Sequence, residues 1–273
     1  MEPRPDHGTR PPDPRGELPG INRGNAASTA EVGAMFDQIA GLYDPLNALI
    51  SGFQEPRWRR RLVAATLLRP GMSALDVATG TGAVARDLAR RVAPDGRVVG
   101  VDVSPGMIAR ALARADEAGE EDHPATDLHF VVGDAMELPV GDGAFDAATI
   151  AFGMRNLPDY ERGFAEMRRA VRPGGIVACL EIARPRSVAG RLGRAWFEWA
   201  VPAIGRMAGQ GDAYRYLVAS VREYPPPGAI AALMRSAGLV DVEWVALTFG
   251  MVTLHTGRRP QGAGTAPRQG RTL

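Results

Sequence analysis

The clearest structural signal in the chain is the stretch at residues 73–92, SALDVATGTGAVARDLARRV. It starts with a short apolar run that contains Asp76, and the turn after that run contains Gly80 and Gly82. A helix pattern follows, in which apolar side chains recur every four residues from Val84. Because glycine lacks Cβ, a ligand can approach the backbone closely where the helix begins and its N–H groups point outward. The stretch therefore predicts a strand, a ligand-binding turn and a helix in succession.

Strand and helix patterns alternate along the rest of the chain. The expected strands are 73–77, 97–102, 128–132, 145–151 and 176–182, and the expected helices are 83–92, 104–118, 159–171 and 227–237. Two further β-rich runs, 241–249 and 251–257, are joined only at Gly250. A parallel crossover needs about a dozen residues, so this pair must be antiparallel. The sequence thus predicts an α/β fold with a doubly wound, mostly parallel seven-stranded sheet that ends in an antiparallel strand pair.

The composition excludes several classes of function. The 273 residues carry a net charge of +1, which gives no support to nucleic-acid binding, because that needs a clustered excess of cations. All 32 basic side chains are Arg, so the chain lacks the lysine of a Schiff base or of a phosphate-binding Walker loop. The single Cys, Cys179, excludes an internal disulfide and a multi-cysteine metal site, and the four His are scattered. We therefore expect no metal.

Both ends of the chain differ from the part between them. Residues 1–25 are rich in Pro and residues 261–273 in small polar side chains, so each is expected to be a disordered tail beside a domain at 26–260. The sequence has neither the apolar run of a secretory signal nor a run long enough to span a membrane, which predicts a cytoplasmic protein. Residues 185–224 break the alternation, and their aromatic helix around Trp196 fits a cap over the substrate. Core packing, or a seam between two copies of the chain, is the alternative.

Three acids lie in or directly after predicted strands, at the edge where an open α/β sheet binds its ligand. Asp102 lies 20 residues beyond Gly82, where it can accept hydrogen bonds from both ribose hydroxyls. Asp134 is placed to meet an adenine amino group, and Asp76, before the turn, suits a cationic aminoacyl group better than a pyrophosphate. The glycine turn also matches the dinucleotide pattern G-x-G-x-x-A, so a nicotinamide oxidoreductase remains an alternative at this point. Each acid can also be a simple loop cap.

Longer stretches of the chain carry a more specific signal. They are MFDQIAGLYDPLNALIS at 35–51, AFGMRNLPDYERGFAEMRRAVRPGG at 151–175, DAYRYLVASVREYP at 212–225 and GMVTLHTGRRP at 250–260. Together with the glycine turn, they resemble the ubiquinone/menaquinone biosynthesis C-methyltransferases, a family of class I enzymes that use S-adenosylmethionine on a Rossmann-like fold. The similarity covers about residues 32–260. One departure lies in the glycine turn, where the family often has Gly-Gly-Thr-Gly and this chain has Ala78-Thr79-Gly80-Thr81-Gly82, with Gly80 and Gly82 kept. The other is Ala151, where the family often has Ser.

The resemblance implies a bound S-adenosylmethionine and the transfer of its methyl group to a ring carbon of a demethylated isoprenoid quinol. The cofactor-binding residues that it implies are Asp76, Gly80, Thr81, Gly82, Asp102, Asp134 and Ala135. A hydroquinone carbon becomes nucleophilic when a neighbouring hydroxyl loses its proton. Our hypothesis is that Arg155 holds the developing phenolate while Asn156 orients it. The suggested substrate residues are Tyr43, Tyr214, Tyr216 and His255. A histidine in a strand can be a general base, or it can have a structural role.

Several alternatives remain open from the sequence. The acceptor can be another small aromatic or lipid, or the protein can be a non-catalytic cofactor-binding subunit of a quinone-synthesis complex. The menaquinone and ubiquinone pathways are not distinguished. A quinol with a long tail also implies peripheral contact with the inner face of the membrane. The arginines at positions 57 and 59–61, around Trp58, are either a solvated helix face or a contact for anionic lipid headgroups.

Overall fold

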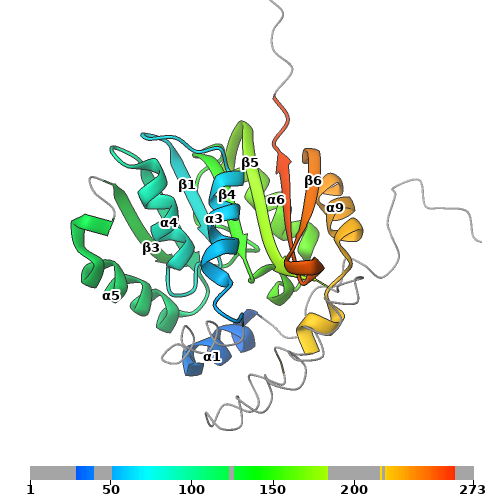
Figure 1. Ribbon diagram of the computed structural model, residues 1–273, viewed down its shortest axis with the longest axis horizontal. Coiled ribbons are helices and arrows are strands. Elements are labelled where there is room, and N and C mark those ends of the chain that lie inside the picture. Colours follow the sequence, from blue (N-terminus) through cyan, green and yellow to red (C-terminus); the bar gives the residue numbers. More distant parts are fainter. Residues whose placement is uncertain (1–28, 40–50, 123–125, 184–215, 217–218, 262–273) are drawn as a thin grey trace, which may run out of the picture.

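The computed structural model describes residues 29–39, 51–122, 126–183, 216 and 219–261. Its centre is a seven-stranded sheet in the order β3-β2-β1-β4-β5-β7-β6 (Figure 1). The strands are β1 (Ser73–Val77), β2 (Arg97–Asp102), β3 (Asp127–Val132), β4 (Phe145–Ala151), β5 (Val171–Ile182), β6 (Val240–Leu247) and β7 (Val252–Arg258). Strands β1 to β5 pair in parallel, and β7 runs antiparallel to both β5 and β6. The predicted doubly wound, mostly parallel sheet with an antiparallel C-terminal pair is confirmed.

Helices cover both faces of the sheet. They are α1 (Thr29–Ile39), α3 (Glu55–Ala65), α4 (Ala83–Val92), α5 (Pro105–Asp122), α6 (Tyr160–Ala170) and α9 (Pro227–Ser236), with the 3-10 turns η1 (Met154–Asn156) and η2 (Thr248–Gly250). On β1, Ala74 packs with α3 and α4 on one face, and Leu75 packs with α6 and α9 on the other. This division follows from the two-residue period of a strand. Figure 1 shows α3 and α4 on the near side of the sheet.

Helices α4 and α6 begin at the residues expected from the sequence. Gly82 is the N-cap of α4, directly after the turn that follows β1. Asp159 is the N-cap of α6, and its carboxylate accepts the backbone N–H of Arg162 at 2.9 Å. The apolar positions predicted for α4, such as Val84 and Leu88, are buried against the sheet. Local capping and apolar spacing therefore place the start of α4 at the carboxyl end of β1.

The start of β5 differs from the prediction. Helix α6 ends at Ala170, and β5 begins at Val171 rather than at Ile176. The Pro-Gly-Gly sequence at 173–175 lies between the helix expected at 159–171 and the strand expected at 176–182. In the structure, the N–H of Gly174 donates to the carbonyl oxygen of Arg259, and the N–H of Arg259 donates to that of Gly175, each at 2.9 Å. Pairing with the segment after β7 thus extends the strand through residues that locally favour a turn.

Candidate active site

The loops at the carboxyl ends of the parallel strands enclose a cavity of about 650 Å³, part of which is open to solvent. The predicted site residues that line it are Gly80, Asp102, Asp134, Ala135 and Asn156. A second cavity beside it is lined by Asp76 and Thr81, among others. The fold therefore gathers these residues from β1, from the end of β2 and from the loops after β1, β3 and β4 at one edge of the sheet, where open α/β sheets bind ligands. Within the described ranges, no group of three or more His, Cys, Asp or Glu side chains is arranged to hold a metal ion.

The glycines of the turn after β1 have backbone conformations that disfavour other residues. Gly80 and Gly82 have φ values of +56° and +76°, in the left-handed region that favours glycine. A Cβ on Gly82 would lie 2.8 Å from Cζ of Phe130, which is too close for two carbon atoms. After β4, a Cβ on Gly153 would lie 2.5 Å from Cβ of Ala78. Gly153 thus lets the loops after β1 and β4 approach each other, and Gly82 lets the start of α4 pack against Phe130 of β3.

Asp102 uses both carboxylate oxygens to order the loops around the cavity. Its Oδ2 accepts the N–H of Gly80 at 2.8 Å, and its Oδ1 accepts the N–H of Ser104 at 3.0 Å. Burial raises the pKa of Asp102, and the hydrogen bonds from these N–H groups oppose the rise. Asp134 accepts the N–H of Met136 at 2.8 Å and lines the same cavity. Because a carboxylate oxygen has two lone pairs, both acids can also accept a hydrogen bond from a ligand.

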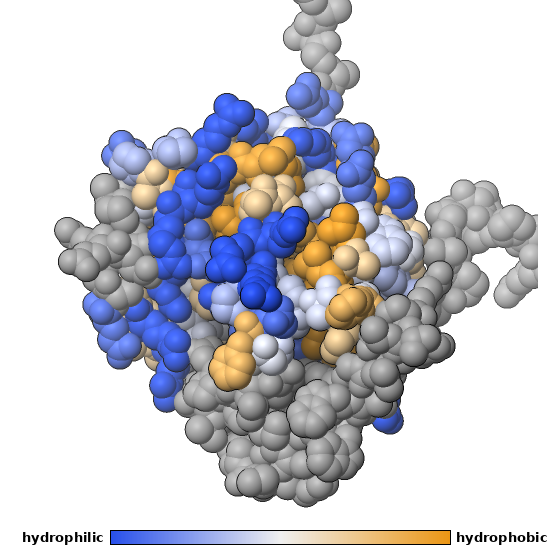
Figure 2. Space-filling view, viewed as in Figure 1, coloured by the Kyte–Doolittle hydropathy of each residue, from blue (hydrophilic) through white to orange (hydrophobic). Residues whose placement is uncertain are grey.

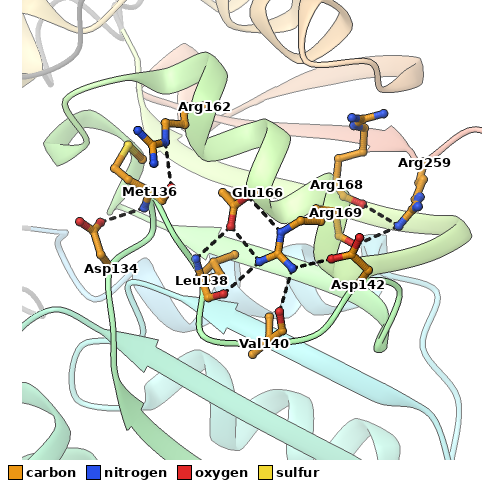
Figure 3. A network of polar contacts seen from close by, with 10 residues as sticks. All are labelled: Asp134, Met136, Leu138, Val140, Asp142, Arg162, Glu166, Arg168, Arg169 and Arg259. Atoms are coloured by element: carbon orange, nitrogen blue, oxygen red, sulfur yellow. Dashed lines mark hydrogen bonds and ion pairs between the residues drawn. The ribbon is translucent and has the colours of Figure 1, made fainter.

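The loop that carries Asp134 and Ala135 is fastened to α6 by arginines (Figure 3). Arg162 donates from Nε to the carbonyl oxygen of Met136 at 2.9 Å. Arg169 donates from Nη2 to the carbonyl oxygen of Leu138 at 2.9 Å. Further partners of Arg169 in this network are Val140, Asp142 and Glu166. The side chains of α6 therefore hold this wall of the cavity in place.

Asp76 is buried beneath the glycine turn. Its Oδ2 accepts the hydroxyl of Thr79 at 2.6 Å, and its Oδ1 accepts the hydroxyl of Thr149 at 2.7 Å. Burial raises the pKa of Asp76 to about 7, although both hydroxyls lower it. The carboxyl group thus links the turn after β1 to the neighbouring strand β4. It also lines the second cavity together with Thr81.

Arg155 is part of a buried ion pair that the sequence did not predict. Its Nη1 lies 2.6 Å from Oε1 of Glu181, and its backbone N–H donates to Oε2 of the same carboxylate at 3.2 Å. The Glu181 side chain is 0% exposed and that of Arg155 is 6% exposed. A signal for Glu181 was present in the sequence, because an acid inside the apolar run 176–182 needs a partner when the strand is buried. Arg155 itself does not line the cavity, whereas its neighbour Asn156 does.

Asn156 connects this region to the predicted substrate cap. The hydroxyl of Tyr216 donates to Oδ1 of Asn156 at 3.3 Å. Burial raises the pKa of Tyr216 to about 12, so the hydroxyl is protonated and can donate. The structure therefore brings Tyr216 next to a residue that lines the cavity. Tyr43, Tyr214 and the aromatic helix around Trp196 lie outside the described residues.

His255 lies away from both cavities. It is fully buried on β7, opposite Cys179 of β5, and its Nε2 lies 3.0 Å from the carbonyl oxygen of Pro227. Burial lowers the pKa of His255 to about 4. The side chain thus packs between β7 and the start of α9. We do not assign it to the substrate site, because this position favours the structural role over contact with a ligand.

Helix α1 covers one side of the cavity. Val32 and Phe36 line it, and Gly33 packs against Val103 in the loop after β2. Oδ1 of Asp37 accepts the backbone N–H of Gly106 at 2.8 Å, at the start of α5. The sequence also fits an N-terminal lid over the cofactor around Tyr43 and Asp44, and α1 is the described helix that precedes those residues.

Known proteins match this chain over most of its length. The sequence profile of the ubiE/COQ5 methyltransferase family matches residues 25–259. The chain is 43% identical to the demethylmenaquinone methyltransferase of Thermus thermophilus, over 83% of this chain and 100% of that protein. It is 41% identical to the ubiquinone/menaquinone biosynthesis C-methyltransferase UbiE of Geobacter sulfurreducens, over 82% of this chain and 87% of that protein. A solved SAM-dependent methyltransferase from Thermotoga maritima shares the fold, with a TM-score of 0.59 and 19% identity over 83% of this chain and 99% of that one. The chain belongs to the ubiE/COQ5 methyltransferase family.

Proposed function

We propose that this protein transfers a methyl group from S-adenosylmethionine to a ring carbon of a demethylated isoprenoid quinol. The observation that carries the proposal is the cavity where Gly80, Asp102, Asp134 and Asn156 meet, in a chain 43% identical to a demethylmenaquinone methyltransferase. Family membership removes the nicotinamide oxidoreductase alternative for the glycine turn. The names of the relatives make demethylmenaquinol the first acceptor to test.

The residues around the cavity fit S-adenosylmethionine. Gly80 lines the cavity and has no side chain, so a ligand can approach the backbone of the turn just before α4. In this proposal, Asp102 binds the ribose hydroxyls and Asp134 with Ala135 binds the adenine, and all three residues line the cavity. The apolar side chains that surround these polar groups are Val32, Phe36, Val101, Met107 and Leu157. Apolar walls with a few polar groups are typical of a cofactor site.

The chain has two tasks in the reaction. When bound, S-adenosylmethionine supplies a methyl group that is electrophilic because it is attached to a positively charged sulfur. The protein must hold the acceptor carbon in line with that group and keep water out. The apolar walls and the cover provided by α1 serve the second task. Holding the acceptor carbon in line requires polar groups on the acceptor side of the cavity, and the loop after β4 supplies them.

Arg155 and Asn156 are proposed to handle the quinol hydroxyl. Asn156 reaches the cavity and can form a hydrogen bond with that hydroxyl. A cation near a phenol favours its ionised form, and the ionised ring is the better carbon nucleophile. Glu181 keeps the Arg155 guanidinium in place and offsets its charge at longer range. Arg155 is therefore expected to act only on groups close to it.

Because the proposed substrate has an isoprenoid tail, contact with a membrane surface is part of the proposal. None of the described helices has the length and apolar character needed to cross a bilayer. Phe53, just before α3, is 72% exposed, and Phe249 of η2 is 71% exposed. Nε1 of Trp58 donates to the hydroxyl of Thr248 at 2.8 Å, which places η2 beside α3. Figure 2 shows hydrophobic residues around the hydrophilic band that follows α3. These aromatic side chains and the exposed arginines of α3 suit the inner face of a membrane with anionic headgroups.

The proposal is tested with the purified full chain, S-adenosylmethionine and demethylmenaquinol or the demethylated ubiquinol precursor. Mass spectrometry is expected to show a quinol heavier by one methyl group and an equal amount of S-adenosylhomocysteine. Phenolic and sterol acceptors are assayed in parallel. Turnover of those acceptors without turnover of a quinol would assign another aromatic or lipid substrate. Cofactor binding without turnover of any acceptor would support the non-catalytic subunit. In a deletion strain, the quinone that accumulates without its methyl group identifies the pathway.

A further inference from the structure

The second cavity holds charged side chains that the proposed reaction does not use. It measures about 460 Å³, with part of that volume open to solvent. It shares Ala78, Gly80, Ala151 and Phe152 with the first cavity, so the two spaces lie against each other around the glycine turn. Its remaining wall includes Glu55 and Arg59 of α3. A ligand bound over Gly80 in the first cavity therefore has α3 within reach at its other end.

Arg59 is fixed in the wall of this cavity from two sides. Its Nη1 donates to Oε1 of Glu55, one turn earlier on α3, at 2.8 Å. Its Nε donates to Oδ2 of Asp87 on α4, also at 2.8 Å. The side chains of the three residues are only 15% to 23% exposed. Among the described residues, Nη2 of Arg59 has no hydrogen-bond partner. A guanidinium held in this way loses little further conformational freedom when it binds an anionic group.

The other arginines of α3 do not share this position. Arg57, Arg60 and Arg61 are exposed, and Arg60 and Arg61 form no ion pair with another described residue. The basic run that looked uniform in the sequence thus contains one arginine that lines a cavity and three that face outward. The exposed ones provide matched controls on the same helix.

The charges around this cavity fit an α-amino acid zwitterion. A fixed guanidinium suits a carboxylate, and the carboxylates of Glu55 and Asp76 suit an ammonium group. With Asp87 included, acidic groups outnumber the single cation, which favours a ligand of net positive charge. S-adenosylmethionine carries an α-carboxylate, an α-ammonium and a positive sulfur. We propose that Arg59 donates to the α-carboxylate of this cofactor and that Glu55 accepts from its α-ammonium. The inference rests on the proposed function and adds α3 to the cofactor site.

The test compares three ligands that differ only at the aminoacyl end. S-adenosylhomocysteine has the whole zwitterion, its decarboxylated analogue lacks the carboxylate, and 5′-methylthioadenosine lacks the aminoacyl part. Their dissociation constants are measured by calorimetry on the wild-type full chain, Arg59→Met and Arg60→Met. In the wild type, loss of the carboxylate should weaken binding about 10- to 100-fold, the range for a charge-assisted hydrogen bond. Arg59→Met should weaken S-adenosylhomocysteine by a similar factor and leave 5′-methylthioadenosine within about twofold. Arg60→Met should change neither.

Each result decides between distinct explanations. If Arg59→Met weakens both ligands equally, the residue only supports the fold around the turn and the inference is wrong. If it weakens neither, the inference is also wrong. Should Arg59→Met not fold, the wild type still decides, because equal affinity for S-adenosylhomocysteine and its decarboxylated analogue excludes a cation at the carboxylate. Glu55→Gln, which removes the charge but not the shape, should weaken S-adenosylhomocysteine selectively as well. If none of the three ligands binds the wild type, the proposed function itself fails.

Discussion

Replacing Glu181 by Leu removes the carboxylate that holds Arg155 inside the protein. The Arg155 side chain is 6% exposed and its Nη1 lies 2.6 Å from Glu181, so the substitution leaves a buried guanidinium without its counter-charge. Breaking a buried ion pair in this way costs roughly 3–5 kcal/mol. In a domain of about this size, each kcal/mol lowers the melting temperature by about 2–4 °C. We therefore expect Glu181→Leu to lower it by roughly 6–20 °C.

The double variant shows whether this loss comes from the pair. Replacing both partners, with Arg155→Met added to Glu181→Leu, leaves no charge to bury, and such replacements are often neutral in stability. Calorimetric melting of the wild type, both single variants and the double variant gives the coupling between the two positions. The double variant should melt within a few degrees of the wild type. If its loss equals the sum of the two single losses, the charges are not coupled and the reasoning is wrong.

Activity then separates stability from chemistry at the same position. The stable double variant should bind S-adenosylhomocysteine like the wild type but turn over the quinol slowly, because the cation proposed to favour the phenolate is gone. Arg155→Gln should likewise reduce turnover far more than cofactor affinity. Wild-type turnover in the double variant would remove Arg155 from the proposed mechanism. An equal loss of turnover and cofactor affinity in Arg155→Gln would do the same.

Three further substitutions test the site and its surroundings. Gly82→Ala should lower the melting temperature by at least about 2–8 °C in calorimetry, because a φ of +76° costs alanine about 1–2 kcal/mol of folding free energy and the new Cβ has no room. Gly228→Ala, in open space on α9, should not lower it, and equal melting of the two variants would contradict this reasoning. The pKa of His255 falls from 6.5 to about 4 on folding, so below pH 6.5 the unfolded chain binds a proton that the folded one does not. Denaturant unfolding should show that the free energy of unfolding of the wild type falls by about 3 kcal/mol more than that of His255→Gln between pH 6.5 and pH 4. Parallel curves of unfolding free energy against pH would contradict this. Arg169→Met should speed hydrogen exchange in the loop at 134–142 and weaken S-adenosylhomocysteine a few-fold, and unchanged exchange would mean that the loop is ordered without this arginine.

Most of the sheet could be predicted because its elements are coded locally. The run at 73–77, the glycines at 80 and 82 and the apolar spacing of α4 lie within twenty residues and specify one strand, turn and helix. The antiparallel pair followed from the short link at Gly250, since chain length alone forbids a parallel crossover there. The early start of β5 could not be predicted, because its Pro-Gly-Gly segment is held by Arg259, which is far away in the sequence.

The candidate site was predicted in part for a similar reason. Acids at the carboxyl ends of strands are recognisable from strand patterns, so Asp102 and Asp134 could be assigned to one cavity. Partners that meet only in three dimensions could not be. Glu181 lies 26 residues from Arg155, and the orientation of Arg59 on α3 depends on Asp87 of α4. Sequence pattern thus identifies which loops form a site, and the packing of helices decides which charged side chains enter it.

The two acids beside the glycine turn illustrate why the assignment of a residue to a ligand needs its protein contacts first. Asp102 accepts the N–H of Gly80, and Asp76 accepts the hydroxyl of Thr79, so both acids order the turn without any ligand. Both carboxyl groups are buried, and burial of an uncompensated charge is costly, so the pKa of each is raised. The two acids differ in the cavity that they line: Asp102 lines the first, whereas Asp76 lines the second, together with Arg59. These acids order the turn before the cofactor binds, so the backbone has little conformational freedom left to lose on binding. The binding free energy is therefore not reduced by the cost of ordering this loop.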